Sequence, residues 1–343
     1  MPTKPPTLAL NKPALPPTCQ TDFHRRWGHL RDPHVRALAW LLTAPNLLDT
    51  QAEQWRGMIA SLDGAMDQAT FNWLAALDAA PTELHAFLDI RPSTRLGHYA
   101  EELLAFYFRR QGILFAHGLQ VRASKGDTVG EFDFLLWHKT GPASAYESAL
   151  LHWEFATKFY LLESSAAGAG SKITADYFVG PNLADTLGAK MRKILDRQLM
   201  LGQHPAAQIH LPQPVASDQA LIKGWLFYHG DDALLPPAIG LSPAHCRGFW
   251  CSLTEFEAMP AERLAILPRL SWLAPARVSP FAALDKPQLQ DALAAQFSHT
   301  TMPVLVALLQ QHGDQNCLLE TSRGFIVPDD WRSKAQQYSQ PGV

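Results

Sequence analysis

The stretch that decides the fold is HWEFATKFY at residues 152–160, where two charged side chains interrupt a long apolar run. Such a run is typical of a buried strand, in which successive side chains point to opposite faces of the sheet. Glu154 and Lys158 therefore share one face with His152 and Ala156. A buried charge is costly unless a partner compensates it, so the stretch indicates either a functional site or a buried ion pair.

The preceding strand candidate, GEFDFLL at residues 130–136, carries a second acidic side chain in apolar surroundings. Strand alternation places Asp133 on the face of Glu131 and Leu135, opposite the face of Phe132, Phe134 and Leu136. Two carboxylates, from Asp133 and Glu154, suit a hard divalent ion such as Mg²⁺. The ion would polarise a phosphate and lower the pKa of a bound water, while Lys158 would orient that water or stabilise charge in the transition state. The alternative is a buried Glu154–Lys158 pair beside an unrelated Asp133.

Hydrophobic periodicity around these strands predicts one α/β core. The expected elements follow the order helix, strand, strand, strand, helix, strand, at residues 96–111, 113–121, 131–137, 150–162, 182–201 and 221–229. Asn182 followed by Asp185 resembles a capping box at the start of the second helix. The predicted fold class is therefore α/β, in the mixed α+β sense, with a four-stranded mixed sheet flanked by helices.

Changes of composition divide the chain into four predicted parts. Residues 1–22 form an extended or disordered arm rich in proline. Residues 23–90 form a helical N-terminal region, and the α/β core takes residues 91–235. Residues 236–343 form a smaller C-terminal accessory region. Outside the core, the pattern predicts helices at 32–44, 55–62, 68–79, 253–259, 286–297 and 303–311, and a hairpin at 317–327.

Asp133, followed by Glu154 and Lys158 on the next strand, resembles the motif of the PD-(D/E)XK nuclease superfamily. The segment GHYAE at residues 97–101 is similar to the first core helix of that superfamily, which implies that Glu101 lies near the metal. The order of helices and strands in the core is also similar. The resemblance implies a restriction-endonuclease-like core, Mg²⁺ or Mn²⁺ as cofactor, and a metal shell of Asp133, Glu154 and Glu101.

One departure from the superfamily motif concerns the lysine. The usual basic residue stands two positions after the glutamate, where this chain has Ala156, and Lys158 lies one pleat further along. A lysine stem spans the displacement of roughly 6–7 Å, which is two residues of strand rise. The alternative is a descendant that has lost turnover. For Glu101 the alternative to a place near the metal is a solvated helix face. His152 shares the face of Glu154 and is either close to the metal or a structural histidine.

A second resemblance covers most of the chain. The segments VRALAW at 35–40, HWEFATKFY at 152–160 and GPN at 180–182 resemble an uncharacterised bacterial family, domain-of-unknown-function family 1853. That family is identified as a member of the same nuclease superfamily, which implies the same core and the same metal chemistry.

Lys190, Lys193 and Arg197 recur at offsets of three and four residues and form one basic stripe on the second core helix. Such a stripe contacts phosphates and positions nucleic acid without reading its sequence. The alternative is an ordinary solvated helix face. With 29 basic and 32 acidic residues the net charge is −3, so attraction for a polyanion has to come from a local patch.

Four cysteines without a CxxC pair argue against a disulfide scaffold and favour a reducing cytoplasm. No apolar run approaches the length of a membrane span. We therefore expect a Mg²⁺-dependent phosphodiesterase that acts on nucleic acid, with DNA the expected substrate and no membrane contact. The alternatives are an inactive nuclease-fold module that binds nucleic acid, and a protein that binds a protein partner through its terminal regions.

Overall fold

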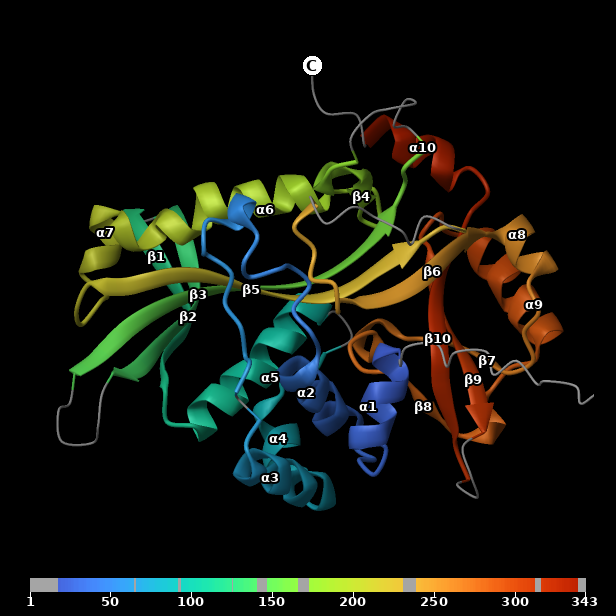
Figure 1. Cartoon of the computed structure of the whole chain (residues 1–343), viewed down its shortest axis with the longest axis horizontal. Coiled ribbons are helices and arrows are strands. Elements are labelled where there is room, and N and C mark those ends of the chain that lie inside the picture. The colour runs from blue at the N-terminus through green and yellow to red at the C-terminus, as the bar shows by residue number, and fades with distance from the viewer. Residues whose placement is uncertain are drawn as a thin grey trace, which may run out of the picture.

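The computed structural model describes residues 18–64, 66–91, 94–124, 126–140, 147–165, 173–230, 239–311 and 316–338. Within these ranges ten strands form one mixed sheet: β1 Leu114–Ser124, β2 Asp127–Thr140, β3 Glu147–Leu162, β4 Phe178–Val179, β5 Val215–Tyr228, β6 Cys246–Ser252, β7 Leu264–Ile266, β8 Arg277–Val278, β9 Val304–Gln311 and β10 Leu318–Val327. The order across the sheet is β1-β2-β3-β5-β6-β10-β9-β7, with β4 beside β3 and β8 beside β10 (Figure 1). Strands β3, β5, β6 and β10 run parallel to one another.

Helices cover both faces of this sheet (Figure 1). One face carries α1 Cys19–Trp27, α2 Pro33–Thr43, α3 Gln68–Ala79, α4 Thr82–Phe87 and α5 Leu96–Arg110. The other face carries α6 Leu187–Asp196 and α7 Pro205–Gln208. The far end of the sheet, at β7 and β9, is packed by α8 Leu253–Ala258 and α9 Lys286–Phe297, and α10 Trp331–Tyr338 follows β10.

Local sequence signals account for the helices that position the core. Asp32 caps α2, because its side chain accepts hydrogen bonds from two backbone N–H groups of the first turn, and Pro33 takes the first helical position. α5 buries an apolar stripe that includes Leu103, Leu104 and Phe108. The helices predicted at 32–44, 68–79, 96–111, 253–259 and 286–297 are confirmed as α2, α3, α5, α8 and α9.

The mixed α/β class is confirmed, but the predicted four-stranded sheet is wrong, because the described residues form a sheet of ten strands. The four expected strands are β1, β2, β3 and β5. β5 pairs with β3 along one edge. Along its other edge, residues 225–228 pair in parallel with residues 246–249 of β6, so the sheet continues. β10, β9 and β7 then extend the sheet beyond β6. The finer expectation of a restriction-endonuclease-like core stays a prediction.

The C-terminal strands replace two elements predicted from the sequence. The helix expected at 303–311 is β9, and the hairpin expected at 317–327 is the single strand β10. Residues 304–309 are apolar throughout, so their periodicity does not separate a buried strand from a buried helix. Gly324, expected in a turn, lies inside β10, where a Cβ atom would stand 2.3 Å from the ring of Phe249. The glycine permits β6 to approach closely.

One further helix prediction is wrong, and another has the wrong ends. Residues expected in a helix at 55–62 form only the 3₁₀ turn η1 Glu53–Trp55 and an extended segment that pairs with Ala220 of β5. The helix expected from Asn182 begins at Leu187, because Thr186 caps it by accepting a hydrogen bond from the backbone N–H of Ala189. It ends at Asp196 and is followed by the 3₁₀ turn η3 Gln198–Gln203.

The predicted division of the chain into four domains or regions stays a prediction. Residues 1–17 of the expected arm lie outside the described residues, and residues 19–22 already belong to α1. The boundary predicted at residue 235 separates β5 from β6, which are neighbours in one sheet.

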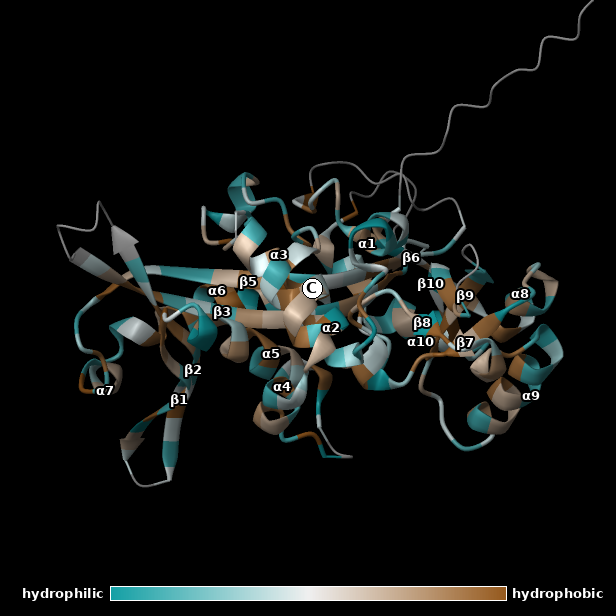
Figure 2. Ribbon diagram, turned by 90° about the horizontal axis from the view of Figure 1, so that it is seen from below, coloured by the Kyte–Doolittle hydropathy of each residue, from teal (hydrophilic) through white to brown (hydrophobic). Residues whose placement is uncertain are grey.

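The helices carry hydrophilic and hydrophobic residues in alternation along their length (Figure 2). α6, for example, buries Leu187, Met191 and Leu195 and exposes Arg192 and Lys193. None of the helices within the described ranges has both the length and the apolar composition that crossing a membrane requires.

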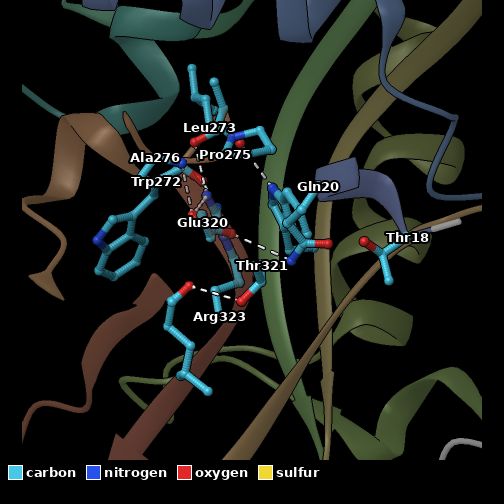
Figure 3. Close-up of polar contacts among 12 residues, drawn as sticks. Thr18, Gln20, Trp272, Leu273, Pro275, Ala276, Glu320, Thr321 and Arg323 are labelled. Carbon is cyan, nitrogen blue, oxygen red and sulfur yellow. Dashed lines mark hydrogen bonds and ion pairs between the residues drawn. The ribbon is translucent and has the colours of Figure 1, made fainter. Parts of the chain in front are cut away.

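A buried polar cluster joins β10 to the N-terminal helices (Figure 3). Arg323 and Glu320 are fully buried and form an ion pair in which Nε lies 2.6 Å from Oε1. Glu320 also accepts hydrogen bonds from the Gln20 side chain of α1 and from the backbone N–H of Ala276. The Arg323 guanidinium donates to two backbone carbonyls of the loop before β8. Both buried charges therefore have compensating partners.

Candidate functional site

The candidate site lies where β2 separates from β3, at Asp133 and Glu154; we call this region the fork. The antiparallel pairing of the two strands ends at Phe134 and Trp153, one residue before Asp133 and Glu154. Beyond that pair, the Oδ2 atom of Asp133 accepts a hydrogen bond of 2.8 Å from the backbone N–H of Phe155. The carboxylate thus accepts a hydrogen bond that a backbone carbonyl of β2 would accept if the strands stayed paired. This bond holds Asp133 against β3.

Side chains of β2 do not alternate strictly through Asp133, which corrects the predicted face assignment. Phe132 packs in one apolar cluster with Leu135, whereas Phe134 belongs to the cluster on the α5 face. The Phe132 ring meets the ring of His152 edge-on, with 4.7 Å between centroids. Because β2 is no longer paired with β3 here, the β1–β2 ribbon is free to twist away.

Glu154 is buried at the centre of a polar chain of side chains. Its exposed fraction is 1%. Its Oε1 atom lies 3.1 Å from Nε2 of His152, and its Oε2 atom accepts a hydrogen bond of 2.5 Å from Gln198. The other ring nitrogen of His152 lies 2.8 Å from the carboxylate of Asp218 on β5. Burial lowers the pKa of His152, but the hydrogen bonds to Asp218 and Glu154 outweigh burial and raise it.

Three carboxylates, from α5, β2 and β3, interact electrostatically at the fork. Burial raises the pKa of Asp133 to about 7, and the charge of Glu154 adds to the effect. Burial likewise raises the pKa of Glu101 on α5 to about 8, with further contributions from Asp133, Glu131 and Glu154. In both groups burial is the largest cause of the raised pKa, and the charges of neighbouring carboxylates add to it.

Lys190 of α6 is the cation that faces these carboxylates. Its ammonium donates a hydrogen bond of 3.1 Å to Oε1 of Gln198, the residue that donates to Glu154. Burial, together with the charges of Lys158 and Lys193, lowers its pKa, while Glu154 and Asp133 oppose that shift. The sequence placed Lys190 in an outer basic stripe. Its distinguishing signal is its position three residues from the buried Leu187 and one from the buried Met191.

Lys158 bonds to a residue just before α6 and takes no part in the hydrogen bonds of Asp133 and Glu154. Its ammonium lies 3.2 Å from Oδ2 of Asp185, an atom that also accepts from the hydroxyl of Tyr160. The buried Glu154–Lys158 pair, the alternative to a metal site, is therefore not formed, because both residues have other partners. Ala156, the position of the superfamily's usual lysine, is buried in the apolar cluster beneath α6. The catalytic role of Lys158 stays a prediction.

The remaining members of the basic stripe are exposed. Lys193 lies on α6, and its charge reaches Lys190. Arg197 stands just past the end of the helix, with φ of −132°. The three side chains therefore do not form one uniform face, because Lys190 is partly buried while Lys193 and Arg197 contact solvent.

The donor set at the fork fits a hard divalent cation with few protein ligands. Within the described ranges, no group of three or more His, Cys, Asp or Glu side chains is arranged to hold a metal. Mg²⁺ commonly takes one or two carboxylates and completes its shell with water and phosphate oxygens. Asp133 and Glu154 offer such oxygens, and a cation would offset both the burial and the repulsion from Glu154 that raise the pKa of Asp133. Glu101 adds a further carboxylate within electrostatic reach.

The raised pKa values predict how stability depends on pH. A carboxyl group whose pKa is higher in the folded chain than in the unfolded one makes the free energy of unfolding fall as pH rises through that interval. For Glu101 the interval runs from 4.5 to about 8. The melting temperature of wild type should fall as pH rises through this interval. Glu101→Gln should remove part of that fall, so the difference in melting temperature between the variant and wild type should grow with pH. Thermal scans of the exposed control Glu83→Gln should stay parallel to wild type, and a parallel Glu101→Gln curve would refute the electrostatic account.

Comparison with known proteins gives one match. No curated protein and no solved structure matches the chain. A family model described as "Domain of unknown function (DUF1853)" matches residues 36–327, which is most of the sequence and includes both strands of the fork. The match agrees with the family resemblance of the segments at 35–40, 152–160 and 180–182. The chain belongs to the DUF1853 family.

Proposed function

We propose that this chain is a divalent-metal-dependent phosphodiesterase that cleaves nucleic acid, with DNA the expected substrate. The observation that carries the proposal is that the buried Glu154 of β3 and the partly buried Asp133 of β2 and Glu101 of α5 act on one another electrostatically at the fork, within reach of the charge of Lys190 from α6. Charge of one sign concentrated at a strand fork stabilises a fold poorly, and it suits the binding of a cation. The order α5, β1, β2, β3, α6, β5, which resembles the PD-(D/E)XK core, supports the same proposal.

Each residue of the fork has a proposed role. Asp133 and Glu154 would hold the metal through carboxylate oxygens, with Glu101 beside them. When bound, Mg²⁺ or Mn²⁺ supplies positive charge that polarises the phosphate and lowers the pKa of a bound water. His152 and Gln198 fix the two oxygens of Glu154. The ammonium of Lys190 stabilises negative charge that develops on the phosphate.

Nucleic acid would be held through its backbone. Lys193 of α6 and Arg197, just past the C-terminal end of the helix, are exposed, and side chains of this type contact phosphates without reading bases. Charge reversal at Lys193 should weaken binding of every sequence alike and flatten its salt dependence.

Two observations favour a second candidate, a nuclease-fold module that binds nucleic acid without turnover. Both oxygens of Glu154 already have hydrogen-bond partners. Lys158, which the superfamily resemblance assigns to catalysis, is bound to Asp185. A module of this kind would bind nucleic acid equally well with a divalent ion and with a chelator.

One experiment separates the two candidates. Purified full-length chain is incubated with labelled single- and double-stranded DNA and RNA, in Mg²⁺, in Mn²⁺ and in a chelator, and both cleavage and binding are measured. The proposal expects cleavage in the metal lanes only. Binding without cleavage in every lane would support the inactive module, and the absence of both would remove the nucleic-acid function altogether.

The two lysines near the fork give a sharper test of the site. We expect Lys190→Ala to lower the cleavage rate on the order of 100-fold, because one preorganised charge partner of the transition state is removed. Lys158→Ala should cause the smaller loss, since its ammonium is bound to Asp185. Single-turnover cleavage rates and melting temperatures are measured on the same samples, with Lys334→Ala of α10, whose side chain is 45% exposed, as the matched control. A larger loss in Lys158→Ala, with its melting temperature unchanged, would return the catalytic role to Lys158.

A further inference from the structure

Two cysteines far apart in the sequence lie side by side at the junction of α1 and β6. Cys19 is the first residue of α1, directly after the capping residue Thr18. Cys246 is the first residue of β6 and is 1% exposed. The two thiols line one cavity and are close enough for each to shift the pKa of the other, and Cys19 Sγ lies 3.8 Å from the carbonyl oxygen of Ala244.

A cavity gives small molecules access to this pair. Its volume is about 260 Å³, and its walls include Cys19, Cys246, Arg26, Trp27 and Trp40. The walls are mainly apolar and aromatic, apart from the two sulfurs and the charged side chains of α1. A molecule of a few heavy atoms fits such a space. Cys19 is partly exposed, whereas Cys246 is buried.

The two thiols differ in acidity. The hydrogen bond from Cys246 lowers the pKa of Cys19, and a thiol at a helix N-terminus is favoured as the thiolate. Burial raises the pKa of Cys246, although the positive charges of Arg323 and Lys223 oppose that shift. Lys223 is itself buried and donates to the carbonyl of Ala44. A partly exposed thiol with a lowered pKa beside a buried thiol with a raised pKa is the arrangement of an attacking and a resolving cysteine.

We propose that Cys19 and Cys246 form a redox-active dithiol site that reacts with small hydroperoxides and closes to a disulfide joining α1 to β6. The site lies apart from the fork and does not depend on the proposed nuclease function.

The reaction balances in two steps. The Cys19 thiolate attacks one oxygen of the hydroperoxide, the O–O bond breaks, and the alkoxide or hydroxide that leaves takes the proton that Cys19 gave up. Cys19 is then a sulfenic acid. The sulfur of Cys246 attacks the sulfur of Cys19, the S–O bond breaks, and the leaving hydroxide takes the proton of Cys246 to become water. Two thiols lose two electrons in total, and the hydroperoxide is reduced to an alcohol, or water, and water.

The other two cysteines provide matched controls inside the same chain. Burial raises the pKa of Cys251 to about 12, which keeps it a thiol. Cys317 is buried next to β10. Neither lines the cavity that contains Cys19 and Cys246. A reaction that depends on the geometry of this cavity should therefore leave Cys251 and Cys317 unchanged.

The test treats the folded full-length chain with hydrogen peroxide and, separately, with a bulky alkyl hydroperoxide. Remaining thiols are alkylated before unfolding, and oxidised ones are reduced and labelled with a second reagent before peptide mapping. We expect the count of free thiols to fall from the four of the sequence to two, with Cys19 and Cys246 carrying the second label. The bulky hydroperoxide should react more slowly, because access is through the cavity.

Variants and a stability measurement complete the test. Cys246→Ser should stop at a sulfenic acid on Cys19 that dimedone traps, whereas Cys251→Ser and Cys317→Ser should still form the disulfide. The oxidised wild type should melt at least ~3 °C higher than the reduced one, because the cross-link restricts the unfolded chain, and dithiothreitol should reverse the shift. A disulfide that contains Cys251 or Cys317, a disulfide between chains, or oxidation of Cys19 alone in the wild type would overturn the proposal. The mapping uses the wild type, so it decides the matter even if a variant does not fold.

Discussion

Asp133→Asn is expected to lose metal-dependent cleavage by at least ~100-fold while the protein becomes no less stable. The substitution removes one hard anionic donor from the fork, so the affinity for Mn²⁺ should fall as well. It keeps an oxygen that can accept the hydrogen bond from the backbone N–H of Phe155, so the end of the β2–β3 ladder should survive. A loss of activity without a loss of stability is the signature of a residue retained for function.

The stability side of this prediction follows from the pKa of Asp133. Burial and the charge of Glu154 raise that pKa from 3.8 to about 7. Above that interval Asp133 is ionised in both states, and its ionisation costs more free energy in the folded chain than in the unfolded one. Asn carries no charge, and the melting temperature of the variant should therefore exceed that of wild type at pH above about 7 and approach it near pH 4. Calorimetric titration with Mn²⁺, thermal scans and cleavage rates are measured together, with the exposed Asp291→Asn of α9 as control. Unchanged Mn²⁺ affinity and unchanged cleavage in Asp133→Asn would remove Asp133 from the site.

Glu320→Gln should destabilise the fold by about 3–5 kcal/mol, because removing one partner leaves the other charge buried. Glu320 accepts from Nε and Nη2 of Arg323 at 2.6 and 2.8 Å, and neither side chain has any exposed area. The amide nitrogen of a glutamine would face a donor at one of these positions. Denaturant unfolding with a fitted midpoint and slope measures the change.

The matched control for that experiment is Asp22→Asn in α1. Asp22 and Arg25 form an ion pair with the same separation of three residues, but their side chains are 47% and 69% exposed. Exposed pairs contribute ~1 kcal/mol or less. A similar small loss in Glu320→Gln would show that the polar cluster of Figure 3 contributes little to stability.

The parts of the fold that the sequence predicts are those with local signals. α2 and α3 have capping aspartates and regular apolar spacing, and both were placed within a residue of their observed ends. β9 was misread because an apolar run has no periodicity to distinguish strand from helix. Residues 58–60 were misread because they pair with β5, a long-range contact that overrides local propensity.

In the candidate site, too, the sequence predicts what depends on neighbouring residues and does not predict contacts with distant ones. Alternation along β3 indicated that Glu154 belongs to a buried polar face, and its burial bears this out. The partners of Glu154 come from elsewhere: Gln198 follows α6, and Asp218, which binds His152, lies on β5. Nothing near these residues in the sequence links them to Glu154. The same is true of Lys190, whose place opposite the carboxylates is set by the packing of α6 on the sheet.

The position of β10 has a consequence for biosynthesis. In the described chain β10 is the last sheet strand to be translated, yet it lies between β6 and β9 in the finished sheet. Until residues 318–327 leave the ribosome, the outer edge of β6 and the inner edge of β9 have no neighbour, and Glu320 and Arg323 are absent from their cluster. Open strand edges pair readily with other chains, and incompletely folded nascent chains are prone to aggregate. Products of premature termination before β10 would therefore be prone to aggregate, and rapid completion of translation would favour the complete sheet.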